Sequence, residues 1–382
     1  MNEIPVLIIG AGPAGLAIAG RLRKQGIPFE LLEKSERIAN IWHEHYDRLH
    51  LHTVKELSHL PHLPFPDDYP RYVPRQKLIA YYEHYAQKFD IRPHFGEEVT
   101  ALNKTGTTWV AHTATGQSWK ARYVVVAVGV NRAINRPVFP EEAAFQGYIQ
   151  HSRLYKNATP FLGQRVLVVG MGNTGAEIAL DLCEQGVFVG ISVRSPVNIV
   201  PRDTFAGPTQ RTALLLSKLP NGLGDWLGTQ LRRLMVGDLS QYGLSTPNVP
   251  PAKQLRTTGK TPVIDIGTVA QIKAGNIKVF PAIQHFEADG VVFVNGEKQA
   301  FDTVILATGY SAQLEDFIEN ANTLLDAYGW PKSCIAEGAH DGLYFLGYDN
   351  YVAGGILGVI YRDSETIAKD ITAKLAGAAA PV

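Results

Sequence analysis

The chain has 382 residues, enough for two or three domains, and its hydrophobic content of 45% supports sizeable cores. Its 36 basic and 36 acidic residues leave a formal net charge of zero, so no global field favours nucleic acid. Its 2 cysteines, Cys183 and Cys334, exclude a disulfide framework and a CxxC redox pair. Because there is no basic leader and no stretch of about 18 apolar residues, we expect no signal peptide and no membrane span. The cytoplasm is the default location.

The first predicted elements are a strand at residues 4–9 and a helix that ends near Gly26, joined by a glycine turn. The turn is a GxGxxG pattern, Gly10-Ala11-Gly12-Pro13-Ala14-Gly15. A strand-turn-helix unit directs backbone N–H groups and the positive end of a helix dipole to one point, where a pyrophosphate binds. We therefore expect a dinucleotide to contact Gly10, Gly12, Pro13, Ala14 and Gly15.

The following strand selects the dinucleotide. It runs over residues 27–33 and ends at Glu33, which lies 23 residues after Gly10. A carboxylate at this place accepts hydrogen bonds from a ribose diol and repels a 2′-phosphate, which favours FAD or NAD. Lys34, the next residue, is a further candidate contact with this cofactor.

The composition of the chain changes after the first strand-helix-strand unit. Residues 35–75 are rich in His, Pro and aromatic residues and should be largely loop. Residues 98–120 are predicted to form two or three hairpin strands, and residues 123–128 form a buried parallel strand that ends at Gly129. The proline-punctuated residues 130–164 are predicted to link two domains.

The strand-helix-strand plan recurs over residues 165–194, with a second GxGxxG turn 160 residues after the first. A guanidinium at Arg194, where the following strand ends, fits a 2′-phosphate bidentately and favours NADP. Arg202, beyond this strand, is expected to face the nicotinamide cofactor. The turn residues expected to contact this cofactor are Gly170, Gly172, Asn173, Thr174 and Gly175. Two different dinucleotides in one chain indicate electron transfer between cofactors, and hence an oxidoreductase.

The remaining elements complete the second unit and return to the first. Residues 203–245 form a helical insert, which could line a substrate channel, contact a partner or a membrane surface, or simply pack. Residues 301–306 form another buried strand, and the turn after it, Ala307-Thr308-Gly309, is a further cofactor contact that corresponds to Gly129. The other predicted elements are strands within 263–282, 290–294 and 343–347 and a helix within 356–375.

These elements predict an α/β fold of two nested Rossmann-like dinucleotide-binding domains. The sheets are parallel with helices on both faces, and small antiparallel sheets are attached. The first domain takes residues 1–155 and 309–382, and the second takes residues 156–308.

A motif between the two glycine turns resembles that of a known family. Residues 145–155, FQGYIQHSRLY, match FxGxxxHxxxY, the identifying motif of class B flavin-containing monooxygenases. We expect Phe145 and His151 to be structural braces within it. Three further stretches are similar to the YUCCA branch of this group: YDRLHLH at 46–52, GKTPVIDIGT at 259–268 and ILATGY at 305–310.

The resemblance implies FAD at the first turn, NADPH at the second, and O2 and a small molecule as substrates. It implies oxidative decarboxylation of an aromatic 2-oxo acid, of the indole-3-pyruvate type, through a flavin C4a-(hydro)peroxide. His52 stands where many N- and S-oxygenating relatives have an asparagine near the flavin. We expect Trp42 and His50 to flank the flavin and His52 and Lys55 to be catalytic.

A substrate carboxylate also needs a cation in its pocket. Lys55 is the first candidate for this cation, and the alternatives are Arg48, Arg202 and Lys260.

Other functions stay open at this point. The same group contains N- and S-oxygenases and Baeyer–Villiger enzymes, and a disulfide reductase or a non-catalytic flavin-binding regulator could also contain nested nucleotide domains. The 12 histidines show no metal-ligand spacing on a helix, so we predict no metal. We expect no nucleic-acid partner and, by default, a homodimer.

Overall fold

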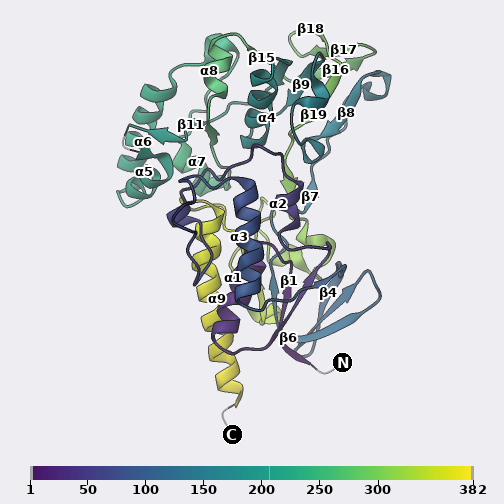
Figure 1. The fold of residues 1–382 in the computed structure, drawn as a ribbon, viewed down its shortest axis with the longest axis vertical. Coiled ribbons are helices and arrows are strands. Elements are labelled where there is room, and N and C mark those ends of the chain that lie inside the picture. The colour runs from purple at the N-terminus through teal and green to yellow at the C-terminus, as the bar shows by residue number, and fades with distance from the viewer. Residues whose placement is uncertain (1–2, 206, 380–382) are drawn as a thin grey trace. The chain divides into compact units, whose positions relative to one another are not determined.

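The structure is a computed structural model that describes residues 3–205 and 207–379. Contacts between residues divide the chain into two compact units. Unit 1 comprises Met1–His43, Thr53–Ala133 and Ser311–Val382, and unit 2 comprises Glu44–His52 and Ile134–Tyr310. Figure 1 labels many of the elements of both units.

Unit 1 is built on a seven-stranded sheet in the order β3-β2-β1-β6-β5-β4, with β21 paired to β6. Its centre is parallel, and β4, β5 and β6 form an antiparallel meander. The central strands are continuous apolar runs because both faces of the sheet are covered. The strands are β1 (Ile4–Ile9), β2 (Phe29–Glu33), β3 (His94–Phe95), β4 (Val99–Thr105), β5 (Thr108–Thr113), β6 (Ser118–Val126) and β21 (Leu343–Phe345).

Helices and the largely irregular segment 312–342 cover the two faces of this sheet. Helix α1 (Pro13–Lys24) packs against α9 (Ile356–Ala379) and α3 (Arg75–Lys88), and α1 and α9 lie side by side in Figure 1. Leu314 and Phe317 of the irregular segment join a buried cluster with residues of β1 and β6. Residues 35–75 were predicted to be largely loop. The helical stretches within them are α2 (Asn40–Glu44), a 3-10 turn (Lys55–Leu57) and the first residue of α3, Arg75.

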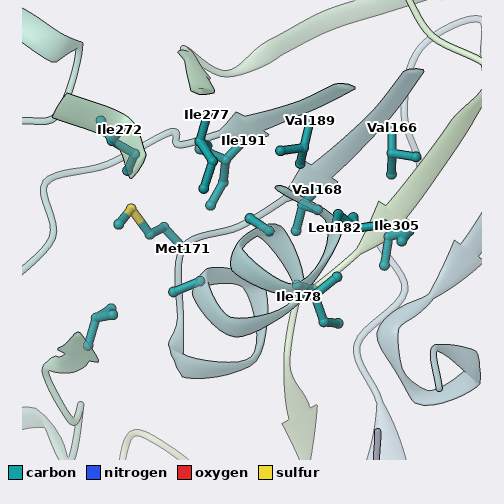
Figure 2. Packing of buried hydrophobic residues seen from close by; sticks show 14 of the residues in the cluster. Val166, Val168, Met171, Ile178, Leu182, Val189, Ile191, Ile272, Ile277 and Ile305 are labelled. Carbon is teal, nitrogen blue, oxygen red and sulfur yellow. The ribbon is translucent and has the colours of Figure 1, made fainter. Parts of the chain in front are cut away.

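Unit 2 is built on a five-stranded parallel sheet in the order β15-β10-β9-β19-β8. Helix α4 (Asn173–Glu184) covers one face, and Figure 2 shows its Ile178 and Leu182 on the side that faces the strands. The three-stranded antiparallel sheet β16-β17-β18 packs on the other face through Phe286 and Phe293. The strands are β8 (Tyr148–His151), β9 (Arg165–Val169), β10 (Phe188–Ser192), β15 (Ile277–Phe280), β16 (Ile283–Glu287), β17 (Gly290–Phe293), β18 (Lys298–Ala300) and β19 (Thr303–Leu306).

The predicted insert is helical, and several of its apolar side chains face solvent. Phe205 is 84% exposed, Leu234 75% and Trp226 58%, so these three side chains do not contribute to the core of unit 2. The elements of this region and its flanks are β11 (Ile199–Pro201), β12 (Asp203–Thr204), β13 (Gly207–Pro208), α5 (Thr209–Leu216), α6 (Asn221–Val236), α7 (Pro251–Thr258), β14 (Val263–Asp265) and α8 (Thr268–Lys273).

The α/β fold with parallel sheets and small antiparallel sheets is confirmed, but two segments group differently from the predicted domains. Residues 134–155 belong to unit 2, because β8 pairs in parallel with β19. The interpretation of 130–164 as a linker was therefore wrong for β8. Residues 44–52 also group with unit 2, away from the sequence that flanks them on both sides. The short strands β7 (Ala133–Ile134) and β20 (Tyr310–Ser311) pair with each other.

Candidate functional site: two glycine turns and the residues around them

The first glycine turn has a shape that only glycine allows at two of its positions. Gly10 has φ +105°, and a Cβ on it would lie 2.6 Å from the carbonyl oxygen of Ala127. A Cβ on Gly15 would lie 1.8 Å from the carbonyl oxygen of Gly10, so helix and strand touch backbone to backbone. Gly12, in contrast, has nothing within 4 Å of its Cβ position, which leaves room for a phosphate against the backbone.

At the start of the helix that follows the first turn, no side chain competes with a ligand for the free backbone N–H groups. Gly12 is the N-cap of α1 and makes no side-chain cap hydrogen bond, and the first turn contains no acidic residue. Pro13 occupies a first-turn position, where its missing N–H costs nothing, and Ala14 is buried. The helix N–H groups and the dipole are therefore available to an anion.

Glu33 lies at the first turn. One carboxylate oxygen accepts a hydrogen bond from Ala11 N at 2.7 Å, and the other accepts from Ser35 N at 2.9 Å. The carboxylate is thus fixed next to the position where a dinucleotide ribose lies in this type of fold. Lys34 is exposed.

The second glycine turn repeats the geometry of the first. Gly170 has φ +104°, and a Cβ on it would lie 2.7 Å from the carbonyl oxygen of Ala307. A Cβ on Gly175 would lie 2.0 Å from the carbonyl oxygen of Gly170, whereas a Cβ on Gly172 would have no atom within 4 Å. Gly172 is the N-cap of α4, again without a side-chain cap. Both turns therefore fit a pyrophosphate.

The polar residues near the second turn have different surroundings. Asn173 accepts a hydrogen bond from Ile264 N at 2.7 Å, so its side chain holds β14 beside α4, and Thr174 is half-buried. Arg194 is exposed and makes no hydrogen bond or ion pair within residues 3–205 and 207–379, which leaves its guanidinium available to a phosphate. Arg202 Nε lies 3.4 Å from an oxygen of Asp203.

The turns after the two buried strands also correspond to each other. Gly129 has φ +79° and Gly309 has φ +86°, conformations that favour glycine. Ala307 is buried, and the hydroxyl of Thr308 donates to the carbonyl oxygen of Asn135. Each of these turns comes shortly after an alanine whose carbonyl oxygen lies against the first glycine of the GxGxxG turn: Ala127 against Gly10, and Ala307 against Gly170.

Trp42, which was predicted to flank the flavin, and Lys55, which was predicted to be catalytic, lie in unit 1. The ring of Trp42 lies 6.2 Å from that of Tyr82 on α3. Lys55 Nζ lies 2.8 Å from the carbonyl oxygens of Asp67 and Tyr69 and 3.4 Å from that of Pro66. Because an ammonium has three donors, this arrangement favours a role for Lys55 in fixing the loop at 66–69 rather than in binding a carboxylate.

The two predicted histidines lie on the segment that belongs to unit 2. His50 is exposed, and its Nδ1 contacts the carbonyl oxygen of Arg48. His52 Nε2 lies 2.8 Å from Oε1 of Glu177 on α4. The structure thus brings His52 to the helix of the second turn. Sequence reasoning missed Glu177, although a single charge within the apolar run Ala176 to Leu180 is a signal of a buried, paired group.

Two residues of the motif at 145–155, His151 and Phe145, pack against other side chains of unit 2. His151 is 5% exposed, its Nδ1 accepts a hydrogen bond from Arg153 N, and its ring packs edge-on against Tyr310. Burial lowers the pKa of His151. Phe145 packs edge-on against Phe286. These contacts support the interpretation of both residues as braces of unit 2.

Within residues 3–205 and 207–379, no three His, Cys, Asp or Glu side chains are grouped to hold a metal ion. None of the helices that the structure describes combines the length and apolar character needed to cross a bilayer.

Comparison with known proteins assigns this geometry to a family. The family model described as "Flavin-binding monooxygenase-like" matches residues 4–326. Among solved structures, a flavin-containing monooxygenase from Stenotrophomonas maltophilia superposes with a TM-score of 0.75 at 21% identity, covering 98% of this chain and 100% of that one, which shows a common fold.

Curated relatives are more similar in sequence. The indole-3-pyruvate monooxygenase YUCCA1 of Oryza sativa subsp. japonica is 38% identical over 96% of this chain and 90% of its own length. YUCCA6 of Arabidopsis thaliana, an indole-3-pyruvate monooxygenase, is also 38% identical, over 96% of this chain and 89% of its own. The chain therefore belongs to the flavin-binding monooxygenase-like family and is an FAD- and NADPH-dependent monooxygenase.

Proposed function

We propose that this monooxygenase converts an aromatic 2-oxo acid of the indole-3-pyruvate type to the acid one carbon shorter. The balanced reaction consumes the 2-oxo acid, O2, NADPH and a proton, and it yields the shortened acid, CO2, water and NADP+. Relatives at 36–38% identity over most of the chain are named for this substrate, which supports the assignment.

We further propose that FAD binds at the first glycine turn and NADPH at the second. The observation that carries this assignment is the contrast between Glu33, fixed beside Ala11 N, and Arg194, exposed and free of protein partners in the described part of the chain. When bound, FAD accepts a hydride from NADPH and activates O2. Residues of the two turns bind and orient the cofactors, and His52 is the proposed catalytic side chain.

The cation for a substrate carboxylate has to be sought outside Lys55 and Arg48. Lys55 is engaged by loop carbonyls, and Arg48 lies 2.8 Å from Glu184 and 3.4 Å from Asp181. We propose the exposed Lys260 for this role, because Arg202 also lies 3.4 Å from a carboxylate, that of Asp203. A cytoplasmic location and a homodimer stay predictions.

A product panel tests the proposal. The purified holoenzyme is offered NADPH and air with indole-3-pyruvate, phenylpyruvate, a tertiary amine, a thioether and a cyclic ketone, and products are identified by mass spectrometry. We expect the shortened acids from the two 2-oxo acids. An N-oxide, sulfoxide or lactone in the absence of any decarboxylated acid would overturn the proposed substrate class.

A further inference from the structure

Glu177 is a buried carboxylate on the helix of the second glycine turn. It lies two residues after Gly175 and is 2% exposed. Its Oε1 lies 2.8 Å from His52 Nε2, and the buried Tyr46 is close enough for Glu177 to raise the pKa of its hydroxyl. All three residues belong to unit 2, so this cluster is complete within one unit.

The contact between Glu177 and His52 favours one tautomer of the ring. A carboxylate oxygen is the natural acceptor for a ring N–H, so Oε1 of Glu177 favours a proton on His52 Nε2. Burial and the nearby Glu177 raise the pKa of Tyr46 well above its usual value, so its hydroxyl keeps its proton. In the tautomer with the proton on Nε2, His52 Nδ1 carries a lone pair and accepts.

His52 Nδ1 is an unsatisfied buried acceptor. The atom is shielded from solvent and has no hydrogen-bond partner within the described residues. Buried polar atoms in native proteins are nearly always paired, so an unpaired one beside the helix of the second glycine turn is a candidate partner for a ligand atom.

We infer that Glu177 is a positioning residue for His52: it holds the imidazole as the Nε2–H tautomer, so that Nδ1 accepts a hydrogen bond from a donor group of the nicotinamide dinucleotide bound at the second turn. This inference rests on the proposal that the second turn binds NADPH. An asparagine, as many relatives have at this place, could either donate or accept, whereas His52 in this cluster offers only an acceptor.

Two isosteric substitutions separate this role from a structural one. In His52→Asn the amide reaches the position of Nδ1 but loses Glu177, and in His52→Gln it reaches the position of Nε2 but loses Nδ1. The Kd of NADP+ is measured by titration of the holoenzyme. We expect His52→Asn to stay within about threefold of wild type and His52→Gln to weaken binding about tenfold. The reverse order, in which the contact with Glu177 alone preserves binding, would overturn the inference.

The tautomer is read directly from the nitrogen shifts of labelled histidine rings, with the His52 signals assigned from their loss in His52→Gln. In wild type we expect Nε2 protonated and Nδ1 unprotonated, and added NADP+ should move the Nδ1 signal. Glu177→Ala should lose the tautomer preference, and Glu177→Gln, whose amide oxygen still accepts, should keep it. A protonated Nδ1 in the neutral wild-type ring would contradict the assignment.

Asp181→Asn is the matched control. Asp181 lies one turn further along α4, pairs with Arg48 and accepts from the Tyr155 hydroxyl, but does not contact His52. This variant should leave the His52 tautomer unchanged, and a changed tautomer would count against a specific role for Glu177. If wild type binds no NADP+, the proposed function fails, while the tautomer measured without nucleotide still decides the role of Glu177.

Discussion

At the scale of single residues, Glu33 and Arg194 lie at the ends of the strands that follow the two glycine turns, β2 and β10. Both glycine turns show the same close approach to an alanine carbonyl and the same open second glycine. Their specificity therefore has to come from the residues at the strand ends, of which one is an anion and the other a cation.

Arg194→Ala tests the cation. Because a charge-assisted bidentate contact to the 2′-phosphate is lost, the Kd of NADPH should rise roughly 10- to 100-fold, whereas that of NADH should barely change. Arg233→Ala removes an exposed arginine of α6 and serves as the control. Equal losses for NADPH and NADH would refute the phosphate role of Arg194.

Gly12→Val tests the open position of the first turn. Its Cβ would meet nothing within 4 Å, and its φ of −79° suits valine, so the apoprotein should keep its stability within about 1 kcal/mol. The side chain would fill the space for the pyrophosphate, and the purified variant should be colourless. Flavin absorbance and thermal unfolding of the apoprotein are the two measurements.

Gly15→Val is the matched comparison: it should prevent folding, whereas Gly12→Val should only prevent FAD binding. A Cβ there would lie 1.8 Å from a backbone oxygen, so this variant should not fold. If the Gly12 variant stays yellow and active, the first turn has been assigned to the wrong ligand.

The turns could be predicted from sequence because their requirements are local: a positive φ and a close backbone approach each demand glycine. The pairing of His52 with Glu177 could not, because it joins side chains 125 positions apart in the chain. The engagement of Lys55 by carbonyls at residues 66–69 was missed for the same reason. A propensity or a motif does not indicate which loop folds back on a lysine.

At the scale of elements, α4 combines three tasks on different faces. Its N-terminus forms the second turn, its Ile178 and Leu182 pack on the strands (Figure 2), and Glu177 and Asp181 hold the segment 44–52. The sequence predicted this helix from the second glycine turn and the strand-helix-strand plan over residues 165–194. It did not predict the strand β8, because a short strand at the sheet edge is stabilised by its pairing with β19 rather than by its own sequence.

Ile178→Ala tests whether packing and binding are separable on this helix. Ile178 is fully buried, so its truncation should lower the free energy of unfolding by about 2–5 kcal/mol, as measured in urea. The ratio of NADPH to NADH affinity should remain as in wild type, because no atom of the turn is removed. A changed ratio would show that the core of unit 2 also sets nucleotide specificity.

At the scale of the whole molecule, the chain repeats one plan twice and gives each copy a different second strand. Sequence alone predicted this doubling, the nested order and the family, because the glycine turns and the motif at 145–155 are dense local signals. The grouping of 44–52 and 134–155 with unit 2 depends on tertiary contacts and was found only in the structure. Neither glycine turn indicates the substrate, because each is assigned to a cofactor.

The most direct test of the central claim is turnover under labelled oxygen gas, ¹⁸O2, with indole-3-pyruvate and NADPH. The account predicts that one labelled oxygen atom enters the carboxylate of indole-3-acetate, and that one CO2 is released for each NADPH consumed in the coupled reaction. Indole-3-acetate without the label, or NADPH consumption that yields only hydrogen peroxide with every 2-oxo acid offered, would contradict it.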